Sequence, residues 1–253
     1  MASTGPRSEV FTTVLVNEHG EVADWPAHRQ RLSMHAQRLR LTLPDEDPEI
    51  DPPSTAALGL ARIGFSGEAW HVAIRHLGVR NEDIDAISFP APRWNDRTNG
   101  TKHGDWGAYT SAKQAAEDAG CDAALLVHDY AIVDGDRATP LVLDEDGTVW
   151  MAPSEAGGGD GVVAKQLEQW LPNLGLPVVR GNLNERTVAR CAELVLVGTG
   201  MGVCHVSSLD GVQLGNARAL STACHTLLSQ HFTDEGTWST VGPHHVATRD
   251  GHR

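Results

Sequence analysis

Residues 99–106 read Asn-Gly-Thr-Lys-His-Gly-Asp-Trp, and this stretch carries one lysine, Lys102, between a polar loop and a helix. The helix is predicted over residues 107–119, where small residues dominate. An apolar strand follows at 123–127, and Asp134 comes after it. Most lysines lie at the surface, but an amine desolvated by small and apolar neighbours becomes nucleophilic toward a carbonyl. We therefore place the candidate chemistry at Lys102, within a mixed α/β fold.

The residues before this stretch predict a small N-terminal α/β lobe. Its expected elements are strands at 11–16 and 21–23, a helix from Trp25-Pro26, a hairpin of 58–65 with 69–74, and a strand at 86–89. An acidic, proline-rich connector at 43–56 is not expected to be regular. The polar loop 90–101 contains the predicted boundary, which separates a lobe of residues 1–95 from a larger lobe of residues 96–232.

The second half predicts a larger lobe in which strands and helices alternate. After the strand at 123–127, further strands are expected at 140–143, 148–151, 177–179, 193–197 and 203–206, and helices at 162–170, 184–190 and 216–231. Glycine-rich turns occur at 157–161 and 198–202. The tail at 233–253 is predicted to be poorly ordered.

Composition limits the classes of function. The formal net charge is −13 and the pI is about 5.3, which argues against nucleic acid and anionic membranes as partners. No apolar run is long enough for a membrane span, and residues 1–9 lack the apolar core of a secretory leader. The four cysteines form no close pair, so a cytoplasmic location is expected. The thirteen histidines show no metal-ligand spacing, and no G-x-S-x-G motif is present.

Two kinds of feature suggest an anion site. The glycine-rich turns at 157–161 and 198–202 can present backbone N–H groups, and the first opens a helix whose N-terminus attracts phosphate. Arg31, within Ala-His-Arg-Gln-Arg-Leu at 27–32, has a guanidinium that can hold phosphate oxygens through paired N–H bonds. The alternatives are flexible connectors for the turns and a solvated helix charge for Arg31. Asp134 is similarly open to a simple role as a turn residue.

Taken together, these residues resemble the class IV aminotransferase family, which includes branched-chain and D-amino acid aminotransferases and 4-amino-4-deoxychorismate lyase. The resemblance runs from Phe11 to about Leu214. Phe-Thr-Thr at 11–13 is similar to the family's first strand, and residues 27–32 are similar to its E-H-x-x-R-L motif. Residues 119–126 resemble the segment that follows the family lysine, and residues 206–211 resemble its closing P-V-x-x-I-D-G.

The resemblance implies a two-lobed fold, with a small α/β lobe and a larger mixed β-barrel-like lobe with helices. It implies pyridoxal 5'-phosphate as cofactor, with Lys102 as the catalytic Schiff-base lysine. It also implies Asp134 at the pyridine nitrogen, and a phosphate site made of Arg31, Val162, Val163, Thr199 and Gly200. A homodimer and a small amino acid or 2-oxo acid substrate are expected on the same grounds.

Four residues are candidates for binding the substrate. Phe11 and Trp106 could wall the pocket, although both residues also suit a plain core. Arg93 and Arg97, on the loop between the predicted lobes, could clamp a substrate carboxylate; the alternative is that they are loop charges in water.

Several positions depart from the family pattern. Asp134 replaces a glutamate, Thr139 an asparagine, Ala164 an arginine and His205 a proline, while Asp105-Trp106 replaces an asparagine. Three hypotheses therefore stand: an aminotransferase, a lyase that eliminates pyruvate, and a family member that has lost cofactor and catalysis. The short chain and Phe-Thr-Thr favour the lyase slightly, and the substitutions at 139, 164 and 205 motivate the third.

Overall fold

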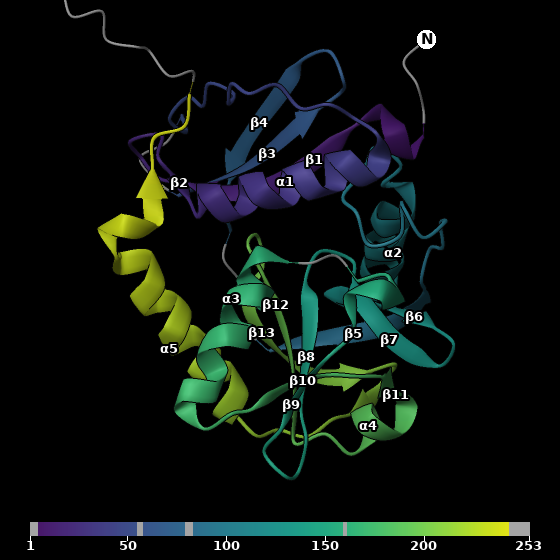
Figure 1. Cartoon of the computed structure of the whole chain (residues 1–253). Helices are drawn as coiled ribbons and strands as arrows, with labels where there is room; N and C mark the ends of the chain where they lie inside the picture. The colour runs from purple at the N-terminus through teal and green to yellow at the C-terminus, as the bar shows by residue number, and fades with distance from the viewer. Residues whose placement is uncertain (1–4, 55–57, 79–82, 159–160, 243–253) are drawn as a thin grey trace, which may run out of the picture.

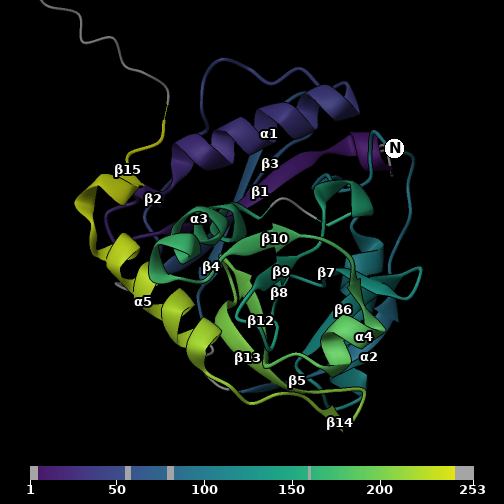
Figure 2. The ribbon, with the colours of Figure 1, turned by 60° about the horizontal axis from the view of Figure 1, so that its bottom comes forward.

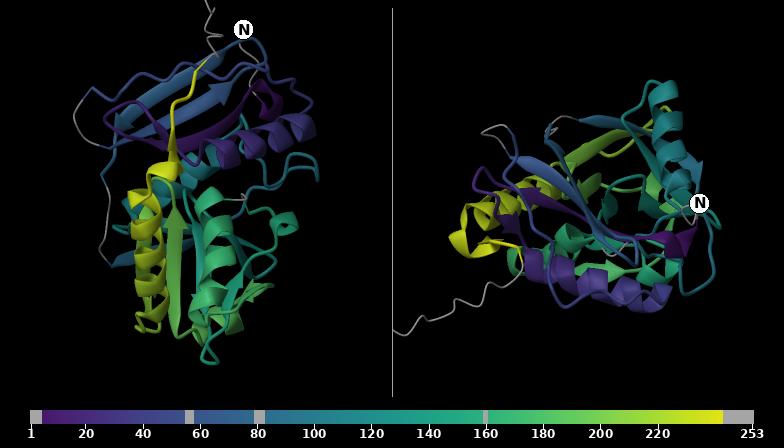
Figure 3. Two further views of the ribbon diagram at one scale, coloured as in Figure 1. Left: turned by 60° about the vertical axis from the view of Figure 1, so that its left-hand side comes forward. Right: turned by 90° about the horizontal axis from the view of Figure 1, so that it is seen from above.

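The computed structural model describes residues 5–54, 58–78, 83–158 and 161–242. It has two lobes stacked on each other, with the small lobe above the large one in Figure 1 and in the left view of Figure 3. Each lobe is built on one sheet, of five and ten strands respectively. The two-lobed α/β architecture predicted from the sequence is confirmed.

The small lobe is an antiparallel sheet covered on one face by a helix. Its strands run in the order β15-β2-β1-β3-β4, with β1 and β3 paired along their full length. Apolar side chains of the helix, Leu32 and Ala36 among them, pack on Val14 and Ile63 of the sheet. The elements are η1 (Pro6–Ser8), β1 (Val10–Val16), β2 (Val22–Ala23), α1 (Trp25–Leu39), β3 (Gly59–Phe65), β4 (Trp70–His76), η4 (Glu235–Thr237) and β15 (Trp238–Ser239).

The large lobe is a strongly curled mixed sheet, seen from its lower side in Figure 2. Its strands run in the order β10-β9-β8-β12-β13-β5-β6-β7-β11, with β14 paired to β13. The strands are β5 (Ile84–Pro90), β6 (Ala123–His128), β7 (Ala131–Gly135), β8 (Thr139–Leu143), β9 (Val149–Met151), β10 (Val178–Arg180), β11 (Leu183–Asn184), β12 (Glu193–Gly198), β13 (Gly202–Leu209) and β14 (Val212–Gln213). The helices are α2 (Gly107–Asp118), η2 (Ser154–Ala156), α3 (Val162–Trp170), η3 (Leu171–Leu174), α4 (Glu185–Ala189) and α5 (Ala219–Thr233).

Strand β12 shows why this sheet is apolar on both faces. Leu194 and Leu196 point to one core, which lies inside the curl, while Val195 and Val197 point to a second core shared with α3 and α5. Successive side chains of a strand face opposite sides, so a strand between two cores is a continuous apolar run.

Three predictions about organisation differ from the structure. β5 was expected in the N-terminal lobe, but it pairs in parallel with β6 and β13 at the centre of the large sheet, so the change of lobe falls between β4 and β5. Residues 131–135 form β7, which the sequence did not predict. The first part of the predicted disordered tail is ordered, because β15 pairs with β2 and Val241 is buried. The rest of that tail, 243–253, lies outside the described residues.

The C-terminal helix α5 joins the two lobes. It packs on β12 and β13, and its His231 lies 2.8 Å from Asp24 Oδ1 at the start of α1. Strand β15 then enters the small sheet (Figures 1 and 3). These contacts fix the orientation of the lobes.

The start of α5 is capped by a distant buried carboxylate. Arg218 at the N-cap makes no side-chain capping bond. Instead, Glu193 of β12 accepts hydrogen bonds from Leu220 N at 2.8 Å and Ser221 N at 3.0 Å, and His205 Nδ1 lies 3.6 Å away. An anionic acceptor at a helix N-terminus satisfies donors that have no partner within the helix.

Replacing Glu193 with alanine is therefore expected to lower the free energy of unfolding by about 2–4 kcal/mol, because the helix donors lose a buried acceptor. Glu193→Gln keeps one oxygen acceptor and should lose about half as much. Urea unfolding of the two variants measures both losses. A loss below about 0.5 kcal/mol for the alanine variant would show that the cap is unimportant.

Candidate active site

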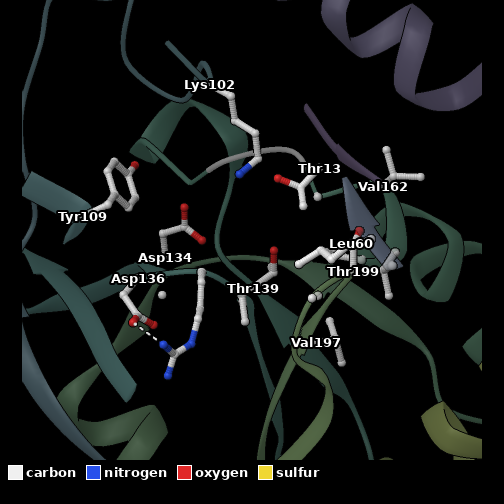
Figure 4. Close-up of a pocket in the computed structure, with 18 of the residues that line it drawn as sticks. Thr13, Leu60, Lys102, Tyr109, Asp134, Asp136, Thr139, Val162, Val197 and Thr199 are labelled. Atoms are coloured by element: carbon white, nitrogen blue, oxygen red, sulfur yellow. Dashed lines mark ion pairs between the residues drawn. The ribbon is translucent and has the colours of Figure 1, made fainter. Parts of the chain in front are cut away.

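A cavity of about 180 Å³ lies where the two lobes meet. The small lobe contributes side chains of β1, α1, β3 and β4, and the large lobe contributes the ends of β7 and β12 and the start of α3. Figure 4 shows Lys102 pointing into this space from above and Asp134 from the facing wall. The residues lining it are Phe11, Thr13, Arg31, Leu60, Arg75, Lys102, Trp106, Tyr109, Asp134, Gly135, Asp136, Arg137, Ala138, Thr139, Gly161, Val162, Val163, Ala164, Val197, Gly198, Thr199 and Gly200.

One face of α1 holds the loop that carries Lys102. Arg38 donates to the carbonyls of Asp96 at 2.9 Å and Asn99 at 2.5 Å, and His35 Nδ1 accepts from Lys102 N at 3.2 Å. Residues 31, 35 and 38 lie on the same side of a helix. The same face of α1 thus sets the position of both Arg31 and the lysine.

Strand β1 fixes the lysine from the other side. Phe11 N donates to Lys102 O at 3.2 Å, and Val10 forms a bridge with His103. The lysine Nζ lies 4.8 Å from the ring of Trp106 and 5.4 Å from that of Phe11. The backbone is tied on both sides, and the amine is held against two aromatic rings.

Burial, together with the positive charges of Arg31 and Arg62 and against an opposing effect of Asp134, lowers the pKa of the Lys102 amine to about 8. At pH 7 the charged form predominates, but the neutral amine is far more populated than in an ordinary lysine with a pKa near 10.5. Such an amine is suited to attack on a carbonyl.

The same shift predicts a pH-dependent stability. The folded protein holds the amine with a pKa of about 8, against 10.5 in the unfolded chain, so the unfolded state binds more protons between these values. The penalty is complete below pH 8 and disappears as the pH rises to 10.5. Lys102→Met should therefore stabilise the cofactor-free protein by on the order of 2 kcal/mol at pH 7, and less at higher pH. Chemical unfolding at a series of pH values measures the difference; an advantage that grows with pH would contradict this.

Arg31 of α1 is buried and lines the cavity. Its Nη2 donates to Thr12 Oγ1 at 2.5 Å and lies 3.4 Å from His28 Nδ1. Burial, followed by the charges of Arg31 and Lys102, lowers the pKa of His28 well below its usual value, so this imidazole is neutral. The positive charge at this end of the cavity therefore comes from Arg31 and not from His28.

Asp134 lies near the end of β7, in a strand and not in a turn. The pairing of β6 with β7 is irregular here, since Leu126 faces Asp134 while Val127 faces Ile132. Such an extra residue bends a strand and re-aims the side chains beside it. Asp134 is buried, and its side chain points toward the space below Lys102 (Figure 4).

Two backbone turns close the far side of the cavity. One is the first turn of α3, where Gly161 precedes Val162 and Val163; the other is the turn at 198–200 between β12 and β13. A Cβ at Gly161 would lie 2.9 Å from Thr139 Oγ1, and one at Gly200 would lie 2.7 Å from Leu60 Cδ2. A side chain at either position would therefore require Thr139 or Leu60 to shift. Gly159 and Asp160 of the first predicted turn lie outside the described residues.

An aromatic group forms the wall beside Lys102. Trp106 and Tyr109 stack at 3.8 Å between ring centroids, and Phe11 meets Trp106 edge-on at 4.9 Å. Phe11 and Trp106 were predicted from the sequence, whereas Tyr109 was missed. Its position in the first turn of α2, soon after the loop that carries Lys102, could have suggested it. Burial, aided by Asp134, raises the pKa of the Tyr109 phenol, which keeps its proton.

The structure places Phe11, Arg31, Lys102, Trp106, Asp134, Val162, Val163, Thr199 and Gly200 around one cavity. It does not bring Arg93 and Arg97 to it. Arg93 donates to Ala156 O at 2.7 Å, and Arg97 is an exposed loop residue. Arg75 and Arg137, which the sequence did not single out, line the cavity in their place.

The departures from the family pattern fall in two places. Thr139 and Ala164 line the cavity, so these substitutions change its surface. His205 is buried beside Glu193 and is not among the lining residues. A histidine at this position contacts Glu193, which caps α5, and does not contribute to the surface of the cavity.

A buried amine, a carboxylate and an arginine around one cleft between two lobes define a site suited to covalent capture of a phosphorylated carbonyl compound. The sequence model of the family described as amino-transferase class IV matches residues 54–209. The chain belongs to the class IV aminotransferase family. None of the curated proteins searched matches the sequence significantly.

Solved structures share the fold. A hypothetical aminotransferase from Mycobacterium tuberculosis, solved with pyridoxal phosphate bound, superposes with a TM-score of 0.77 at 19% identity, covering 89% of each chain. The branched-chain amino acid aminotransferase of Escherichia coli gives 0.76 at 16% identity, covering 92% of this chain and 90% of that one. A putative 4-amino-4-deoxychorismate lyase from Legionella pneumophila gives 0.75 at 15% identity, covering 88% and 91%. No helix in the described part of the chain is long and apolar enough to cross a bilayer.

Proposed function

We propose that this chain is a pyridoxal-phosphate-dependent aminotransferase that moves an amino group between a small amino acid and a 2-oxo acid. The observation that carries the proposal is the placement of Lys102, Asp134 and Arg31 around one cavity that two glycine turns close. The proposal includes the homodimer expected from the family resemblance.

The residues present fit the cofactor. The lysine amine has a lowered pKa, which suits reaction with an aldehyde. The N-terminal turn of α3 supplies backbone N–H groups and a favourable dipole for a phosphate. Thr139 lies close to Gly161 and Leu60 lies close to Gly200, so both glycines keep the two turns open to a ligand only while these neighbours stay in place.

Arg31, Val162, Val163, Thr199 and Gly200 would hold the phosphate through the guanidinium and the backbone N–H groups. The bound cofactor supplies an aldehyde and a ring that accepts electrons. Asp134 would hold a proton at the ring nitrogen.

Lys102 then has two roles. Its neutral amine would hold the aldehyde carbon of the cofactor, and the same amine would take the proton from the substrate α-carbon. The rings of Phe11 and Trp106 lie against the Lys102 amine and shield it from water. In such a dry site the attraction between the Asp134 carboxylate and a positive charge on the cofactor ring would be stronger than in water.

A lyase reaction is the second candidate, since it uses the same lysine and the same proton removal. The short chain and Phe-Thr-Thr at 11–13, in place of the family's Phe-Glu-Thr, favour it slightly. Thr12 accepts a hydrogen bond from Arg31, and Thr13 lines the cavity. Product analysis separates the two reactions. After incubation of the cofactor-loaded protein with amino acids, the aminotransferase gives a 2-oxo acid and the amine form of the cofactor. The lyase would release pyruvate without conversion of the cofactor.

Loss of cofactor binding is the third hypothesis, motivated by Thr139, Ala164 and His205. It predicts protein that stays colourless when pyridoxal phosphate is added. Under our proposal the added cofactor produces a visible absorption band, and colourless protein would remove both enzyme hypotheses.

A further inference from the structure

A second hollow of about 450 Å³ adjoins the cavity on the side of α2. Six residues line both spaces, namely Arg75, Trp106, Tyr109, Asp136, Arg137 and Gly200. Because they share these six residues, the hollow lies directly against the cavity that contains the Lys102 amine. We call it the outer hollow.

The cations of the outer hollow differ in their pairing. Lys113 forms an ion pair with Glu117 one turn along α2. Arg137 donates to Asp122 O and lies 3.7 Å from a carboxylate oxygen of Asp136 (Figure 4, dashed line). Arg75, by contrast, makes neither a hydrogen bond nor an ion pair through its side chain with any part of the chain that the structure describes.

The register of the small sheet aims Arg75 at the site. Arg75 of β4 lies opposite Leu60 of β3, and cross-strand partners point to the same face of a sheet. Leu60 lines the cavity, where it meets the turn at Gly200. Arg75 therefore extends from the cavity-facing side of the small lobe, at the edge of the sheet.

Three guanidiniums line the cavity, those of Arg31, Arg75 and Arg137, and the first two have different surroundings. Arg31 is buried and lines only the inner cavity, whereas Arg75 is exposed and lines the outer hollow as well. A guanidinium stays charged at any pH at which the protein is folded, and it binds carboxylates through two parallel N–H bonds. The buried charge of Arg31 suits a phosphate that stays bound, whereas the exposed charge of Arg75 suits an anion that exchanges with solvent.

We propose that Arg75 recognises the carboxylate of the incoming amino acid or 2-oxo acid at the mouth of the site, with the stacked pair of Trp106 and Tyr109 beside its apolar part. This rests on the proposed function, because the substrate class follows from the chemistry assigned to Lys102. Arg75 is thus a specificity-determining residue on a strand of the small lobe.

The test uses an unreactive carboxylate and its neutral match. 4-Methylpentanoate and 4-methylpentanamide have the same apolar body and carry neither amine nor ketone. Calorimetric titration of the full-length protein, with and without pyridoxal phosphate, is expected to show tighter binding of the carboxylate. Arg75→Leu should weaken carboxylate binding by about tenfold or more and leave the amide unchanged. Arg75→Lys should restore part of the loss.

Two further variants provide controls. Lys113→Met removes a paired cation of the same hollow and should change carboxylate affinity less than about threefold. Arg97→Leu tests the rival site on the loop. The proposal is overturned if Arg75→Leu keeps wild-type carboxylate affinity, if wild-type protein does not prefer the carboxylate, or if Arg97→Leu alone shows the loss.

Cofactor uptake, read from the absorption band, separates this proposal from the proposed function. Wild-type protein that stays colourless contradicts the proposed function, whereas the comparison of carboxylate with amide still tests Arg75. Uptake that fails in Arg75→Leu but not in wild type would assign Arg75 to the cofactor and overturn its role toward substrate.

Discussion

Replacing Lys102 with alanine is expected to abolish the visible absorption band and to reduce turnover by about 10⁴-fold or more. Under the proposed function one amine provides both the covalent link and the proton transfer, and no other amine lines the cavity among the described residues. Absorption spectra of the purified variant with added pyridoxal phosphate, and turnover with amino acid and 2-oxo acid mixtures, measure the two effects.

The small number of lysines in the chain makes a complete set of control variants possible. The sequence has only three lysines, Lys102, Lys113 and Lys165. Lys113→Ala and Lys165→Ala should keep both the band and the turnover, because Lys113 is paired with Glu117 and Lys165 lies on α3 outside the lining of the inner cavity. A band that survives Lys102→Ala and disappears in either of the other variants would assign the link to another lysine.

Asp134→Asn is expected to lower turnover by about 10²–10³-fold while the protein still takes up the cofactor. The amide keeps the shape of the buried side chain but removes the negative charge that would hold a proton on the ring nitrogen. Asp134→Glu, which restores the family residue, should retain a large part of the activity. Steady-state kinetics, with cofactor content measured for each variant, tests this.

A neighbouring carboxylate supplies the matched control. Asp136 is buried, lies two residues further along, and lines the same cavity, but it sits beside Arg137. Burial raises the pKa of Asp136. Asp136→Asn should cost less than about tenfold in turnover, since its charge is already partly offset by Arg137. Equal losses at both positions would mean that general charge balance, and not contact with the ring, makes Asp134 important.

Much of the architecture was predictable because local patterns dominate it. α3 begins and ends where apolar periodicity and the preceding glycine predict, and the β3–β4 hairpin forms around Ser66-Gly67. β5 was placed in the wrong lobe because its alternation predicts a strand without telling which sheet it joins. β15 was missed since it has only two residues and depends on pairing with the distant strand β2. β7 forms a hairpin with β6, but it was missed because the two turn residues between them, Asp129 and Tyr130, adopt positive φ without a glycine to mark the turn.

The cavity was predictable where a motif fixes a residue relative to its own element. Lys102, Arg31 and the two glycine turns each belong to a local pattern, and all of them line one space. Arg75 and Thr13 were missed because they reach the site through the packing of one lobe on the other, which spacing along the chain does not encode. Arg93 and Arg97 were chosen for their loop position, and the fold turns that loop so that Arg93 bonds Ala156 O.

The central claim is that the amine of Lys102 forms a covalent bond with pyridoxal phosphate, and one measurement tests it most directly. The protein is incubated with the cofactor, reduced with borohydride, digested and mapped by mass spectrometry. We predict that the phosphopyridoxyl group is found on the peptide that contains Lys102 and on neither of the other two lysines. Modification of Lys113 or Lys165 in preference to Lys102, or no modification at all, would contradict this account.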